Sequence, residues 1–191
     1  MRSISQPVMC CLGLALRGAF LIGPQTMHAQ EMPLTLVAED ANHLDLKDLG
    51  YGEYEIATTG TDPFVSTAPL TVAYDAGTCS VLCFETFALS KVDDVQLFFG
   101  PPIAETHSVS GLTIDSSEGW MPFAANLGQS PRWKAGKTTF RIDFGRKAGV
   151  TLRIRNLRLR KMTEQEHKER QITLTDRQGK EAKRKSLAKN I

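Results

Sequence analysis

The stretch TTFRIDFGRKAGVTLRIRNLRLR, residues 138–160, decides the fold class of this chain. Apolar and polar residues alternate with a period of two in both halves of it. Such alternation is typical of β-strands that place one face in a core and the other in solvent. The residues from Gly145 to Gly149, between the two halves, have the composition of a turn. We therefore predict a closing β-hairpin in which Phe144 faces Val150.

The same alternation runs through residues 30–161, with Gly, Pro or Asp about every ten residues and no stretch of helical periodicity. This pattern predicts an all-β domain, a two-sheet antiparallel β-sandwich (jelly roll) around one core. The other predicted strands are Leu34–Ala38, Tyr54–Thr58, Leu70–Tyr74, Val81–Leu89, Val95–Phe99, Leu112–Ile114 and Trp120–Phe123.

Residues 1–29 have the features of an export signal peptide. Arg2 supplies a positive start, an apolar run follows, and small residues lead to Ala29. The alternative is an uncleaved membrane anchor, but Arg17 interrupts the apolar run, and a span needs about 18 such residues. We expect a secreted or periplasmic protein with no transmembrane span in its mature form.

Residues 162–191 form a charged tail, predicted to be a polar helix or linker that projects from the body. Thr163 and Glu166 have the spacing of a capping box, which marks a helix start. From residue 160 onwards the chain carries ten Lys/Arg and five Asp/Glu, whereas residues 30–159 carry eleven Lys/Arg and sixteen Asp/Glu. Because the body is mildly acidic, we expect no nucleic-acid partner.

Two cysteines, Cys79 and Cys83, remain if the leader is removed. On one continuous strand they would lie about 13 Å apart, too far for a disulfide. A disulfide would require Cys79 to lie in the preceding turn. In the other alternative, the two cysteines are free and act as small buried residues of a core strand. No histidine is near enough in sequence to suggest a metal site.

The strand predicted from Val81 to Leu89 is apolar on both faces, which predicts a central strand covered on both sides. Glu85 interrupts one of these faces, and a covered carboxylate is costly unless it is paired. We therefore predict an arginine partner for Glu85 from the last strand. In that last strand, the change of parity after Ile154 predicts a β-bulge near Arg155 and Asn156.

In the predicted hairpin, Arg141 faces Arg153, and like charges directly opposite each other are unfavourable. We therefore expect a structural set of ion pairs on a sheet face. Its predicted members are Glu85, Arg141, Arg153 and Arg155. The alternative is that these arginines bind an anionic or hydroxyl-rich ligand.

Several aromatic residues occur in or beside predicted loops, where a sandwich presents ligand sites. Aromatic rings stack on the apolar C–H faces of sugars, while nearby polar side chains bind the hydroxyl groups. The candidate ligand-binding residues are Trp120, Trp133, Tyr51, Phe64, Asp62 and Arg132. No nucleophile, phosphate-loop or metal-ligand motif is present, so we predict a protein without catalytic activity. A carboxylate pair of the glycosidase type is the weakest of the alternatives.

Taken together, the segments YEIATTGTDPFV (54–65), VLCFETF (81–87), VQLFFGPP (95–102) and 140–160, with those around both tryptophans, resemble a galactose-binding-like jelly roll of the carbohydrate-binding-module type. Similar modules occur in secreted bacterial polysaccharide-processing proteins. The resemblance implies an exported module that binds a polysaccharide or other glycan beside a catalytic domain absent from this chain. It implies no cofactor, although a structural calcium ion is compatible with it. The alternative is a structural spacer or protein-interaction module without a small ligand.

Overall fold

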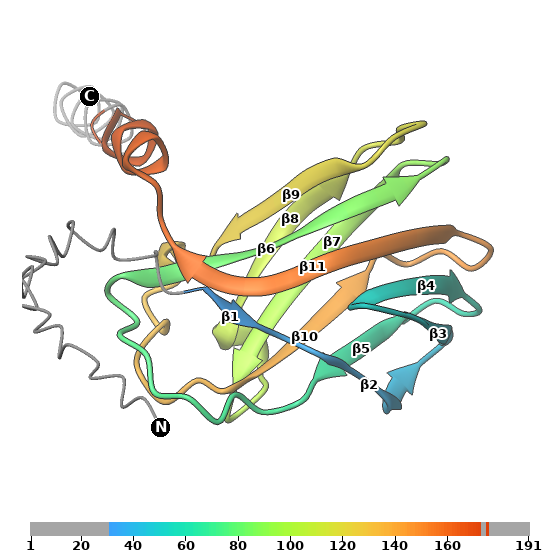
Figure 1. The fold of residues 1–191 in the computed structure, drawn as a ribbon, viewed down its shortest axis with the longest axis horizontal. Coiled ribbons are helices and arrows are strands. Elements are labelled where there is room, and N and C mark those ends of the chain that lie inside the picture. Colours follow the sequence, from blue (N-terminus) through green and yellow to red (C-terminus); the bar gives the residue numbers. More distant parts are fainter. Residues whose placement is uncertain (1–30, 173–174, 176–191) are drawn as a thin grey trace, which may run out of the picture.

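The computed structural model describes residues 31–172 and residue 175, which form two packed β-sheets (Figure 1). The strands are β1 (Met32–Pro33), β2 (Leu36–Asn42), β3 (Leu44–Gly50), β4 (Glu53–Thr58), β5 (Phe64–Thr67), β6 (Cys79–Ala88), β7 (Val92–Gly100), β8 (Ser108–Ile114), β9 (Met121–Asn126), β10 (Thr139–Phe144) and β11 (Thr151–Lys161). Short 3-10 turns occur at η1 (Glu105–His107) and η2 (Leu127–Gln129).

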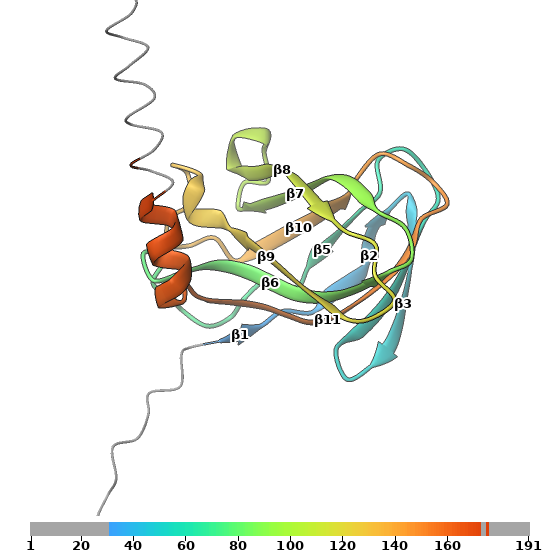
Figure 2. The same cartoon turned by 90° about the horizontal axis from the view of Figure 1, so that it is seen from above.

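The two sheets are antiparallel and form two layers. The six-stranded sheet has the order β3-β4-β11-β6-β9, with β1 also paired to β11, and the five-stranded sheet has the order β2-β5-β10-β7-β8. Figure 2 shows β10 and β7 in one layer and β11 and β6 in the other. The predicted two-sheet antiparallel β-sandwich is therefore confirmed.

One hydrophobic core lies between the sheets, as the alternation predicts. Phe140 and Ile142 of β10 and Leu152 and Ile154 of β11 are each 1% exposed or less. Burial of such side chains contributes about 1.5–3 kcal/mol each, and the core therefore holds the two layers together.

The predicted hairpin of β10 and β11 is wrong. β10 pairs with β5 and β7, whereas β11 pairs with β4, β6 and β1, so residues 145–150 cross from one sheet to the other. Arg141 consequently lies opposite Ser66 and Phe98 and does not face Arg153. Alternation indicates which side of a strand faces the core but carries no information about its neighbours in the sheet.

The predicted β-bulge in the last strand is confirmed. The pairing of β11 with β6 shifts register between Arg155 and Arg158, and Asn156 has a φ of 56°. Asparagine tolerates this left-handed conformation better than most residues. The extra residue returns Leu157 and Leu159 to the core, where both are buried.

The predicted secondary structure differs from the observed one at residues 70–74 and at three missed strands, β1, β3 and β5. Residues 70–74 are not a strand: they run along the core edge, where the Leu70 N–H donates to the Thr138 carbonyl. Residues 44–50, not predicted as a strand, form β3 and pair with β4. Edge strands are partly exposed, so their sequence shows weaker alternation.

The predicted central position of β6 is confirmed, but its outer side is covered only at Val81 and Cys83. β6 lies between β11 and β9. On the side facing away from the core, Val81 and Cys83 form a small buried cluster with Met162 of the tail. Both Cys79 and Cys83 are free and buried, as in the alternative without a disulfide.

The capping box at the start of the tail is confirmed. The Thr163 N–H donates to Glu166 Oε2 at 2.7 Å, and the Glu166 N–H donates to Thr163 Oγ1 at 3.2 Å. Residues 164–172 are helical, and no helix among the described residues is long and apolar enough to cross a membrane. The predicted signal segment 1–29 and most of the tail after residue 172 lie outside the described residues.

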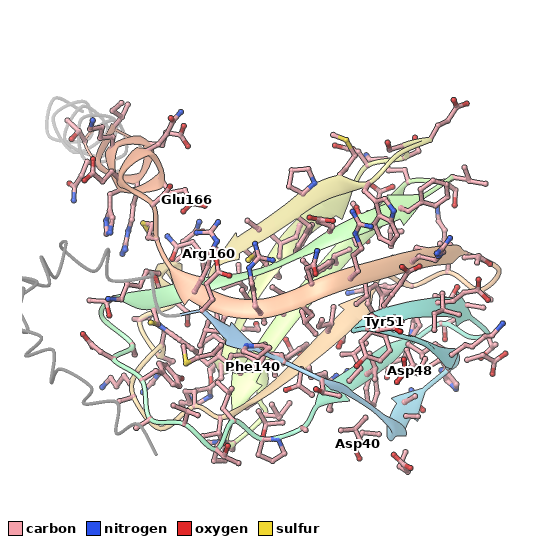
Figure 3. The ribbon with its side chains drawn as sticks, viewed as in Figure 1. Asp40, Asp48, Tyr51, Phe140, Arg160 and Glu166 are labelled. Atoms are coloured by element: carbon pink, nitrogen blue, oxygen red, sulfur yellow. The ribbon has the colours of Figure 1, made fainter. Side chains whose placement is uncertain are left out.

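The helix projects from the end of β11, as expected, but its first turns are fastened to the body. Arg160 donates two hydrogen bonds of 2.8 Å to Glu166, side by side in Figure 3. This contact with Arg160 lowers the pKa of Glu166 to about 2. Further along, Arg170 donates to the Gly128 carbonyl at 3.1 Å.

Candidate functional site

The structure distributes the six predicted ligand-binding residues over separate places. Trp120 lies at the outer face of the six-stranded sheet. Tyr51 occupies the β3–β4 turn, and Arg132 is exposed in the loop after η2. Phe64 and Asp62 lie beside the outer face of the five-stranded sheet. The sixth residue, Trp133, is in the core.

Trp133 does not have the exposed position that its loop context suggests. It is 8% exposed, and its indole N–H donates to the Ala76 carbonyl at 2.9 Å. Tyr74 stacks on it at 5.7 Å between ring centroids, and Phe99 meets it edge-on at 5.2 Å. Its rings are therefore covered by protein, and Trp133 offers no face to a ligand.

Trp120 instead lies at the end of a row of outward side chains. The strand pairings align Lys47 with Glu55, Glu55 with Arg153, and Arg153 with Phe87. Trp120 directly precedes β9, and its ring lies 6.0 Å from that of Phe87, tilted by 56°. This row crosses the outer face of the six-stranded sheet, with its aromatic end at β6 and β9.

Two arginines of β11 lie over the indole of Trp120. The guanidinium carbon of Arg155 is 4.1 Å from the Trp120 ring centroid, and that of Arg153 is 5.5 Å away. Cation–π contacts of this kind contribute about 0.5–1 kcal/mol at exposed sites. Trp120 remains half-buried, so the arginines orient the ring without enclosing it.

Each of these arginines also has a carboxylate partner. Arg155 Nε donates to Glu85 Oε2 at 2.6 Å, which confirms the predicted arginine partner for Glu85. Arg153 donates to Glu53 of β4. The hydrogen bond from Arg155 is the main cause that lowers the pKa of Glu85. At neutral pH this face therefore presents fixed charged donors and acceptors around one aromatic ring.

A second charged cluster occupies the outer face of the five-stranded sheet. Arg141 donates to both oxygens of Asp143 at 2.7 and 2.8 Å, and it lies 3.7 Å from Asp62. Its guanidinium carbon is 3.5 Å from the Phe64 ring centroid and 5.0 Å from that of Phe98. The four predicted ion-pair residues thus belong to two different sheets, and Arg141 is separate from Glu85, Arg153 and Arg155.

This second cluster is more closed than the first. The side chains of Arg141 and Asp143 are 22% and 13% exposed, against 38% and 33% for Arg155 and Glu85. Its guanidinium is also held against Phe64. We interpret it as structural packing of a half-buried ion pair on a sheet face.

Tyr51 is the most exposed aromatic residue of the part that the structure describes. It lies in the left-handed conformation, φ 54°, between Gly50 and Gly52 at the β3–β4 turn (Figure 3). In Figure 2 this hairpin extends to the side of β11 that faces away from the five-stranded sheet. Tyr51 and Trp120 are thus both associated with the outer side of the six-stranded sheet.

Within residues 31–172, no group of three or more His, Cys, Asp or Glu side chains is arranged to hold a metal ion. Asp93 of β7 is paired with Lys91 at 2.7 Å. A structural calcium ion stays a prediction from resemblance.

No protein-family model matches the chain, and no curated protein sequence matches it. Solved structures do match. The family 29 carbohydrate-binding module CBM29_1 from Piromyces equi is 7% identical with a TM-score of 0.50, over 72% of this chain and 94% of that module.

A low-affinity xylan-binding module, CBM86 from Roseburia intestinalis, is 11% identical with a TM-score of 0.48, over 70% of this chain and 95% of that module. At these identities the likeness concerns the fold. This chain has a β-sandwich fold of the kind found in carbohydrate-binding modules.

Proposed function

We propose that this protein is an exported, non-catalytic module that binds glycans on the outer face of its six-stranded sheet. The observation that carries the proposal is the position of Trp120. Its ring is half-exposed on an outward sheet face and is oriented by Arg155 and Phe87. Ligand-binding sites combine apolar and aromatic surface with a few precisely placed polar groups, and this face has both.

The binding mechanism follows from the chemistry of the face. The C–H side of a pyranose ring stacks on Trp120, because both surfaces are flat and apolar. The ionised Glu53 and Glu85 accept hydrogen bonds from sugar hydroxyl groups, and Arg153 and Arg155 donate to sugar oxygens. Hydrogen bonds with one charged partner are the stronger kind. Since these groups are already paired with each other, little reorganisation is needed on binding.

The similarity of fold supports glycan binding and the lack of catalytic activity. The neighbouring structure with a TM-score of 0.50 is named as a carbohydrate-binding module, a class of protein without catalysis of its own. Export is supported by the features of residues 1–29, and a secreted or periplasmic location is part of the proposal.

Affinity electrophoresis of the full chain in gels containing soluble polysaccharides tests the proposal. Xylan, glucomannan, a β-glucan and an anionic polygalacturonate cover neutral and charged ligands. We expect retarded migration in at least one gel, and loss of the retardation for Trp120→Ala. The matched control is Phe64→Ala, which removes an aromatic ring from the opposite sheet and leaves the retardation in place.

Two results would contradict the proposal. No retardation in any gel, with a glycan array also negative, removes glycan binding. Retention that survives Trp120→Ala but is lost in Phe64→Ala moves the site to the five-stranded sheet.

The second candidate function, a spacer for a neighbouring domain, is favoured by the attachment of the tail helix. Met162 packs against Val81 and Cys83, and Arg160 holds Glu166. These contacts hold the first turns of the helix against the body, as a spacer that positions a neighbour requires. The spacer role predicts that fusion of a reporter domain directly after residue 172 gives a restricted orientation, measurable by small-angle scattering, that Glu166→Ala relaxes.

A further inference from the structure

A polar pocket lies on the same outer face, at the β-bulge of β11. It has a volume of about 310 Å³, at the lower end of the range for small-ligand pockets. Its lining residues are Glu31, Pro33, Glu85, Asn156, Leu157 and Arg158. None of these residues belongs to the row of outward side chains that ends at Trp120. Glu85 is linked to Trp120 through Arg155, its ion-pair partner.

The topology explains why the hollow forms there. On one side of β11, β4 pairs with residues 151–155, and β1 pairs with Arg158 and Leu159. Asn156 therefore faces the space between Pro33, the last residue of β1, and Glu53, the first residue of β4. The bulge adds one residue at this point and turns the Asn156 backbone to a φ of 56°.

The pocket contains polar groups that suit a sugar. Arg158 Nη1 donates to the Asn156 carbonyl at 2.8 Å, and Arg158 Nε lies 3.3 Å from Glu31 Oε2. This Nε is buried and pairs with Glu31 without the geometry of a hydrogen bond. Two carboxylates, an amide and the guanidinium of Arg158 thus lie around an apolar floor formed by Pro33 and Leu157.

Glu85 connects this pocket to Trp120. Its carboxylate accepts from Arg155, which stacks on Trp120, and the Asn156 side chain also contributes to lowering the pKa of Glu85. Phe87, beside Trp120, follows the pocket by one or two outward positions of β6. At about 6.6 Å per two residues, the separation is roughly 7–13 Å, which exceeds one sugar ring.

We propose that the pocket at Asn156 is a second sugar subsite, and that the protein recognises an oligosaccharide segment lying along β11 and β6. This inference rests on the proposed function and adds the minimum length of the ligand. One ring stacks on Trp120, a following part of the chain passes Arg155 and Glu85, and a further ring enters the pocket. A monosaccharide reaches only one of the two subsites, and occupation of both requires a longer chain.

Calorimetric titration of the full chain with cello- and xylo-oligosaccharides, from disaccharide to hexasaccharide, tests the subsite. We expect the affinity of the wild type to rise about tenfold or more between disaccharide and hexasaccharide. Asn156→Gly keeps the left-handed backbone, since glycine adopts it freely, and removes the side chain. This variant should lose most of the gain with length and keep its disaccharide affinity, whereas Trp120→Ala weakens all lengths.

The matched control is Asp94→Gly, the same substitution type at another left-handed position, φ 58°, in the five-stranded sheet. It should bind as the wild type does, and thermal unfolding should show all variants folded. Equal affinities for short and long oligosaccharides, or an unchanged length dependence in Asn156→Gly, overturn the subsite while glycan binding stands. Absence of binding to every length and to the polysaccharide gels overturns the proposed function as well.

Discussion

Arg155 stacks on Trp120, with its guanidinium carbon 4.1 Å from the centroid of the indole ring. The same guanidinium donates to Glu85, so one side chain joins the aromatic ring to the carboxylate. The contact is possible because the pairing of β11 with β6 places Arg155 opposite Glu85, next to the row that contains Phe87. The Arg155–Glu85 ion pair and the outward-facing Trp120 ring are therefore parts of one arrangement.

Removing Arg155 should impair binding more than stability. We expect Arg155→Ala to lower the free energy of unfolding by about 1 kcal/mol or less, because the pair with Glu85 is partly exposed. Glycan retention should fall several-fold, because Trp120 loses the group that orients it. Urea unfolding and affinity electrophoresis measure the two effects. A variant that binds fully would show that Arg155 does not orient the ring.

Removing Arg141 from its pair with Asp143, on the five-stranded sheet, should impair stability more than binding. Arg141→Ala leaves Asp143, which is 13% exposed, without its bidentate partner. Removal of one partner from such a pair typically costs about 3 kcal/mol. We expect a clear loss of unfolding free energy with unchanged glycan retention. The double variant Arg141→Ala/Asp143→Ala should recover part of the loss, and no recovery would disprove the coupling.

The two tryptophans should report different parts of the molecule. Trp133 is buried and Trp120 is half-exposed, so glycan addition should change the fluorescence of Trp120 alone. We expect the change to persist in Trp133→Phe and to vanish in Trp120→Phe. Acrylamide should quench the second variant less than the first. The reverse order of quenching would place the exposed ring elsewhere.

Acid should loosen the attachment of the tail helix. The hydrogen bonds from Arg160 lower the pKa of Glu166 to about 2, below its value in an unfolded chain of about 4.3. A carboxyl with a lowered folded pKa stabilises the folded form above its unfolded pKa. That stabilisation is lost as the pH falls from about 4.3 towards 2.

Hydrogen exchange of residues 164–170, compared at neutral pH and near pH 3, measures this loss. After division by the intrinsic exchange rate at each pH, we expect a lower protection factor at the lower pH in the wild type. The amides of the Glu166→Gln variant should exchange faster than those of the wild type at neutral pH. Their protection should change little between neutral pH and pH 3. Equal protection of wild type and variant at neutral pH would contradict the prediction.

Local pattern was sufficient for several features of this protein. The parity change after Ile154 located the bulge at Asn156, and the charge of Glu85 on an apolar strand required an arginine from β11. The spacing of Thr163 and Glu166 located the helix start. Each of these follows from one segment, or from the cost of leaving a charge unpaired, and needs no knowledge of the whole fold.

Strand pairing could not be read in the same way. Residues 145–150 have the composition of a hairpin turn, yet they cross between the sheets, because a turn and a crossover of this length share their chemistry. Trp133 has polar neighbours on both sides, but its ring points into the core. The pocket at Asn156 had no signal in the sequence, since it is formed where β1 ends and β4 begins along β11.

The alternation of apolar and polar residues determined which side chains are buried, and therefore the two-layer β architecture. This is possible because the free energy of burying a side chain depends on its own polarity. The site depends on which strands become neighbours. Trp120, Arg155, Glu85 and Asn156 come together only because β6 lies between β9 and β11, and that order is set by long-range packing of the whole core.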